Sequence, residues 1–205
     1  MPSRDLLRRA SLAGYVVGVA GALALVTLSF FFMAGQPFGT INDVALIVTI
    51  IALPFLMLAF WELGGLTPTP LALAAQALGW LAAAAWCVTH VLFITGVVGI
   101  DYSAGAASGA LAIESVALIV IGLWIAGANL LAGPWLSNLR WFGLVVGVGV
   151  VLYGLGTLTA GTNGPLIYVG ALAYLILLPV WGLLMGLYVA ARADRGRATQ
   201  RQPGA

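Results

Sequence analysis

The sequence predicts an all-α fold, a six-helix transmembrane bundle with short loops and with its N- and C-termini cytoplasmic. Three observations predict this fold. The chain is 62% hydrophobic and only 7% charged, whereas a soluble domain has about 25% charged residues. Six apolar segments are each long enough to cross a hydrocarbon core of about 30 Å. All eight basic residues are arginines in the two tails or in one short loop, which is typical of the cytoplasmic side.

The predicted spans follow one another with little sequence between them. Turn-forming sequences separate them, namely GQPFGTIND, GGLTPTP, GIDYSAG, AGPWLSNLR and AGTNGP. We expect one integral-membrane domain over residues 1–192 and a disordered cytoplasmic tail over residues 193–205. The six expected spans are residues 12–34, 44–62, 71–98, 106–132, 141–160 and 165–191.

The first three spans have distinct local signals. Residues 12–34 follow three arginines and form a run of 23 residues, which is longer than the 7–15 apolar residues of a typical signal peptide. Asn42 and Asp43 precede the span 44–62, and we interpret them as a helix N-cap and a dipole-matched acid. The span 71–98 carries the only histidine and the only cysteine of the chain.

The last three spans are defined by small residues and proline. The span 106–132 ends before a Pro-Trp-Leu turn that contains Arg140. The span 141–160 is rich in glycine, and the span 165–191 contains Pro179, where we expect a kink. With six spans, both tails and the loop of Arg140 lie on one side of the membrane, and the other side has no basic residue.

Glycine recurs at helical spacing within three spans. Small residues at this spacing let helix backbones approach closely where no hydrophobic force drives helices together. We expect these glycines to pack the bundle internally, and homodimerisation through one of their faces is the alternative. The packing glycines are Gly14, Gly18, Gly143, Gly147, Gly182 and Gly186.

His90 and Glu114 are the principal candidate for a polar site inside the membrane. Both lie twelve positions from Tyr102, the centre of the turn between their spans, so an antiparallel hairpin places them at the same depth. Cys87 is one helical turn before His90, and Trp86 is positioned to stack on its ring. Two interpretations stay open, a protonatable site and an interhelical hydrogen bond that only fixes packing.

A second polar pair is expected near the cytoplasmic rim. Glu62 and Gln76 are each seven residues from Thr69, in the middle of the break between the second and third spans. A carboxylate at this depth can extend toward water. We therefore expect Gln76 to hold Glu62 at the rim.

The chain lacks the motifs of the common membrane enzymes. One histidine cannot supply bis-histidine haem ligation, and the sequence contains no HExxH, CxxC, P-loop or nucleophile elbow. No metal or cofactor is predicted, and no broad basic face is present for nucleic acid. Whether the protein is an enzyme stays open, and these absences favour a protein that is not one.

The stretch from Ala117 to Leu155, ALIVIGLWIAGANLLAGPWLSNLRWFGLVVGVGVVLYGL, combines an apolar span, a Pro-Trp-Leu turn with one arginine and a glycine-rich span. In this half of the chain the sequence resembles small bacterial multi-pass membrane proteins that are classified as domains of unknown function. The resemblance rests on composition and turn placement, and it implies membership of such a family without any site residue.

Three functional interpretations follow from the sequence. The first is a small polytopic protein of the bacterial inner membrane without catalytic chemistry, either an accessory subunit or a bundle that binds lipid or a partner helix. The second is a small transporter or channel with a protonatable site at His90 and Glu114. The third is a cofactor protein that uses its single histidine. The lipid bilayer is the expected partner, and a homo-oligomer or a larger membrane complex stays open.

Overall fold

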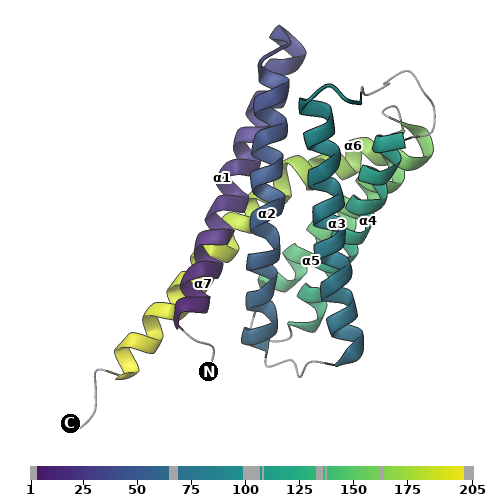
Figure 1. Ribbon diagram of the computed structural model, residues 1–205. Coiled ribbons are helices and arrows are strands. Elements are labelled where there is room, and N and C mark those ends of the chain that lie inside the picture. The colour runs from purple at the N-terminus through teal and green to yellow at the C-terminus, as the bar shows by residue number, and fades with distance from the viewer. Residues whose placement is uncertain are drawn as a thin grey trace.

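The protein is a bundle of long helices (Figure 1). The computed structural model describes residues 4–64, 69–98, 107, 109–132, 136, 138–161 and 164–200. Within these residues, six helical segments are long and apolar enough to cross a membrane, so the chain is a multi-pass membrane protein. The elements are α1 (Arg4–Ala34), α2 (Phe38–Gly64), α3 (Pro70–Ile94), α4 (Gly109–Leu131), α5 (Asn138–Ala160), α6 (Pro165–Ala171), the π-helical segment η2 (Leu172–Leu177) and α7 (Leu178–Gln200).

Local sequence explains where several helices begin and end. Thr69 caps α3 by accepting a hydrogen bond from the Ala72 backbone N–H at 3.3 Å, and Pro70 occupies the first turn, where its missing N–H is harmless. Gly35 follows α1 with φ +70°, the left-handed conformation that glycine adopts without steric cost after a helix. The connection between α1 and α2 is therefore very short.

The six spans form a closed ring. Each span packs against its neighbours in sequence, and α7 returns to pack against α1. The α1–α2 connection lies at one end of the bundle, and the N- and C-termini lie at the other (Figure 1). The interior is filled by large apolar side chains that are fully buried, among them Trp86, Trp181 and Phe60. The ring therefore encloses a packed core.

The predicted packing glycines lie at two interfaces within the chain. On α1, a Cβ atom added to Gly14 would come within 2.6 Å of the Gly186 backbone nitrogen on α7. On α5, a Cβ atom at Gly147 would lie 2.6 Å from the Gly122 carbonyl oxygen on α4. Gly18 and Gly182 belong to the first interface, and Gly143 faces Asn129 across the second. These faces are used inside the bundle, so they do not present a free surface to a second copy.

Several helix boundaries differ from those of the expected spans. Helix α2 begins at Phe38, so Asn42 and Asp43 lie inside its second turn and do not cap it. Helix α3 ends at Ile94, before the predicted end at residue 98, because Gly96 adopts φ +68°. Helix α7 continues to Gln200, because alanine and arginine are strong helix formers. The remainder of the tail that was expected from residue 193, residues 201–205, lies outside the described residues.

The last span is interrupted by the π-helical segment η2, which ends two residues before Pro179. Proline has no backbone N–H, and its ring crowds the carbonyl one turn earlier. A π-helical turn admits an extra residue into the helix and is frequent at functional sites. Tyr174 lies within this segment and is buried. Helix α2, by comparison, continues through Pro54 as one helix.

Candidate functional site

Three ionisable side chains from three successive spans meet in one cluster. His90 on α3 lies between Asp43 on α2 and Glu114 on α4. Its Nδ1 atom is 3.0 Å from Asp43 Oδ1, and its Nε2 atom is 3.3 Å from Glu114 Oε1. The imidazole therefore has a carboxylate on each of its two nitrogens. We call these three residues the carboxylate–imidazole cluster.

The alternating direction of the helices explains this convergence. Asp43 lies five residues after the start of α2, and Glu114 lies five residues after the start of α4. His90 lies four residues before the end of the antiparallel α3. At about 1.5 Å of rise per residue, all three lie about 6–8 Å inside the same end of the bundle. This end is opposite the chain termini (Figure 1).

Aromatic rings hold the imidazole in place. The Trp86 ring, one turn earlier on α3, lies 3.8 Å from the His90 ring between centroids, and the Phe93 ring meets it edge-on at 5.7 Å. The His90 side chain is only 6% exposed, whereas those of Glu114 and Asp43 are 13% and 20% exposed. Access to the cluster is therefore through the carboxylates rather than through the histidine.

The cluster needs two protons to satisfy its two contacts. With a proton on each nitrogen, His90 donates one hydrogen bond to Asp43 and one to Glu114. The three groups then carry one net negative charge. Loss of a proton would leave a nitrogen lone pair facing a carboxylate, which is repulsive. Gain of a proton by either carboxylate makes the cluster neutral.

No arginine is available to neutralise this charge within the described part of the chain. Arg8, Arg9 and Arg192 lie near the termini, and Arg140 lies in the first turn of α5 at the same end of the bundle. The cluster lies at the opposite end. No described arginine therefore lies at the end of the bundle that holds the cluster.

Tyr174 on η2 contributes a buried hydroxyl group to the interior of the bundle. Its side chain is 6% exposed, and its hydroxyl has no hydrogen-bond partner among the described residues. Its ring stacks on that of Tyr153 with centroids 5.1 Å apart. The Trp86 indole nitrogen is likewise buried without a partner in the described residues. Two buried hydrogen-bond donors of the bundle thus have no partner among the described residues.

The structure brings together the pair that the sequence singled out and adds a third member. His90 and Glu114 meet at the predicted common depth. Asp43 was missed, because it was interpreted as an N-cap residue. A depth argument could have found it, since the midpoint between residues 43 and 90 falls in the GGLTPTP break. Cys87 does not join the cluster and packs, partly buried, against the hydrophobic core.

The second predicted pair is only partly described. The side chain of Glu62 lies outside the described residues, so its contact with Gln76 stays a prediction. The Oε1 atom of Gln76 accepts a hydrogen bond from the Trp124 indole N–H at 3.0 Å. Gln76 therefore links α3 to α4 near the end of the bundle that contains the termini.

The geometry is unfavourable for His90 to bind a metal ion or a haem iron. A ligating imidazole needs a free nitrogen lone pair, and both nitrogens here face carboxylates at hydrogen-bond distance. Within the described residues, no three His, Cys, Asp or Glu side chains converge in a way that could hold a metal ion. The cluster is suited to binding protons.

No protein-family model matches the chain, and no match was found among curated proteins or solved structures.

Proposed function

We propose that this multi-pass membrane protein is a small proton-coupled transporter in which Asp43, His90 and Glu114 form the proton-binding site. The observation that carries the proposal is the pair of contacts at 3.0 and 3.3 Å that place one imidazole between two carboxylates inside the bundle. Ionisable groups inside a membrane are costly, and they commonly mark ion pathways or proton relays.

The charge of the cluster favours reversible proton uptake. One additional proton converts the singly negative cluster into a neutral one, and both carboxylates are partly accessible. In a low-dielectric interior the neutral form avoids the desolvation cost of a charge. Binding of a single proton is therefore sufficient to neutralise the cluster.

Proton uptake also changes how the helices are held together. The contact between His90 and Asp43 joins α3 to α2, which packs less extensively against α3 than against α1. Protonation of Asp43 removes the charge from this contact, and charged hydrogen bonds are about twice as strong as neutral ones. The α2–α3 seam is thus the interface that we expect to loosen when the site binds a proton.

The arginine distribution supports one orientation. The positive-inside rule places the termini in the cytoplasm, so the cluster would face the exterior of a bacterial inner membrane. The proton-motive force then delivers protons to the accessible side of the site.

Charge displacement on a solid-supported membrane tests this proposal without a known substrate. A pH jump applied to adsorbed proteoliposomes should give a transient current with the wild-type protein as the site binds protons. Glu114→Gln should abolish the current. Thr89→Val should retain it, because the one partner of the Thr89 hydroxyl among the described residues is the Trp86 carbonyl of its own helix. A wild-type current in Glu114→Gln, or none in the wild type, would refute proton binding at the cluster.

A second candidate is a non-catalytic bundle that serves as an accessory subunit or binds a partner helix. The fully buried core, with Trp86, Trp181 and Phe60, favours it. In that case the carboxylate–imidazole cluster only fastens three spans together. The two candidates differ in the pH-jump current, which a purely structural cluster does not produce.

A further inference from the structure

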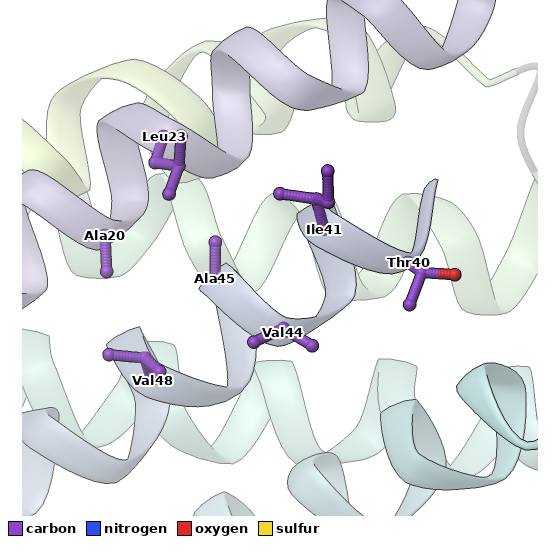
Figure 2. Close-up of a pocket in the computed structure, with 7 residues that line it drawn as sticks. All are labelled: Ala20, Leu23, Thr40, Ile41, Val44, Ala45 and Val48. Atoms are coloured by element: carbon purple, nitrogen blue, oxygen red, sulfur yellow. The ribbon is translucent and has the colours of Figure 1, made fainter. Parts of the chain in front are cut away.

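Two apolar hollows lie in the groove between α1 and α2, and they share Val48. The first, nearer the termini, has a volume of about 380 Å³ and includes Arg9 among its lining residues. The second, nearer the α1–α2 connection, has a volume of about 280 Å³ (Figure 2). The two hollows differ in charge, and this difference indicates what the first one binds.

The first hollow has the form of a slot for an extended apolar chain. Its floor consists of Ala13 and Ala52, which are buried and too small to fill the space between the helices. Its walls are large side chains that remain exposed, with Leu12 at 64%, Ile51 at 54% and Phe55 at 48%. An occupant of this slot would therefore contact apolar atoms along its length.

A positive charge marks the end of the slot nearest the termini. Arg9 is exposed there, and Arg8 lines an adjoining hollow together with Ser11 and Tyr15. Asp5 is one turn earlier, yet neither arginine forms an ion pair within the described residues. The guanidinium group is suited to bidentate binding of a phosphate.

The second hollow provides an internal comparison. Figure 2 shows that its lining residues come from the facing sides of α1 and α2. Its only polar side chain is Thr40, whose hydroxyl already donates to Gln36 Oε1 at 3.2 Å. Without a charged group, this hollow offers nothing that distinguishes one lipid head group from another.

We infer that the first hollow is a binding site for one anionic phospholipid, with its phosphate at Arg9 and one acyl chain in the slot. From Arg9 to Val16 the slot extends seven residues along α1, or about 10 Å. This length fits within one leaflet, which is about half of the 30 Å hydrocarbon core. The inference is independent of the proposed transport function, because it concerns the opposite end of the bundle.

Native mass spectrometry in detergent micelles tests the site. The full-length protein is mixed with phosphatidylglycerol or with phosphatidylcholine of identical acyl chains, and bound lipid is counted. The wild type should retain phosphatidylglycerol in preference. Arg9→Gln should reduce this preference about fivefold. A basic residue near an anionic lipid contributes about 1 kcal/mol to binding, which corresponds to about a fivefold change in affinity. Arg140→Gln, which removes the same charge at the same end but outside the slot, should leave it unchanged.

Photo-crosslinking then locates the bound chain. Phosphatidylglycerol with a diazirine on its acyl chain should label peptides that contain Leu12 or Phe55 in the wild type and much less in Arg9→Gln. Equal losses in Arg9→Gln and Arg140→Gln would overturn the inference by showing non-specific attraction to charge. Dimers that exclude the lipid would also overturn it, because the groove would then hold a second copy of the chain.

Discussion

Substitution of His90 by phenylalanine isolates the two hydrogen bonds of the carboxylate–imidazole cluster. Phenylalanine keeps a planar ring on Trp86, whose centroid lies 3.8 Å from the histidine ring, but it removes both nitrogen atoms. The packing is largely retained, while Asp43 and Glu114 each lose a partner. The variant therefore measures what the polar contacts contribute to stability.

The expected destabilisation is about 1–3 kcal/mol. In water-soluble proteins a hydrogen bond to a charged group contributes about 1.5–3 kcal/mol. Interhelical hydrogen bonds in membranes contribute less, about 0.6 kcal/mol on average and at most about 1.7 kcal/mol, because the unfolded chain also finds partners there. Two bonds on that scale, at His90, give the quoted range.

Unfolding by sodium dodecyl sulfate in mixed micelles, followed by circular dichroism, measures this free energy. Combining His90→Phe with Asp43→Asn or with Glu114→Gln gives two double-mutant cycles. Each cycle should show a coupling energy of about 0.5 kcal/mol or more, because the residues share a contact. A destabilisation below about 0.3 kcal/mol, or additive effects in both cycles, would refute the reasoning.

Three further predictions use the same unfolding assay. Gly122→Ala should destabilise the bundle by about 1–3 kcal/mol, since its Cβ would lie 2.7 Å from a backbone nitrogen of α5, whereas Gly127→Ala on the same helix meets nothing within 4 Å and should be neutral or stabilising; equal effects would contradict the packing. Tyr174→Phe should be neutral or stabilising, because the buried hydroxyl has no partner among the described residues, and a loss above about 1 kcal/mol would disprove that. Trp124→Phe should lower the free energy of unfolding by about 0.6–1.7 kcal/mol, because it removes the hydrogen bond from the Trp124 indole to Gln76. In this background Gln76→Leu should have little further effect, and additive effects of the two substitutions would argue against the bond.

Hydropathy was sufficient to predict six membrane-spanning helices, but not the residues at which the helices begin and end. The number of spans follows from their length and apolar composition. The start of α2 at Phe38 was missed because the residues around the GQPFG turn are polar enough to resemble a loop. The polar end of α7 was assigned to a disordered tail, because spans are predicted from runs of apolar residues and this arginine-rich helix end contains no such run.

The sequence was sufficient to predict the depth of His90 and Glu114 in the membrane, but not the rotation of each helix about its own axis. Counting residues from a turn places His90 and Glu114 at one level, and the structure brings them into contact. Which side of each helix faces the neighbour depends on packing across the whole ring, including the glycine interfaces, and no single span encodes it. Asp43 is a different case: its depth can be counted from the sequence, but its position just before the expected span 44–62 indicated an N-cap residue.

Infrared difference spectroscopy of the reconstituted protein tests the central claim most directly, because it detects the protonation of a carboxyl group. Acidification of the wild type should produce a carbonyl band of a protonated carboxylic acid, and His90→Phe should shift the pH at which this band appears. The band should be lost or reduced in Glu114→Gln or Asp43→Asn. A wild-type spectrum without a pH-dependent carboxylic acid band, or an unchanged band in both carboxylate variants, would contradict proton binding by the cluster.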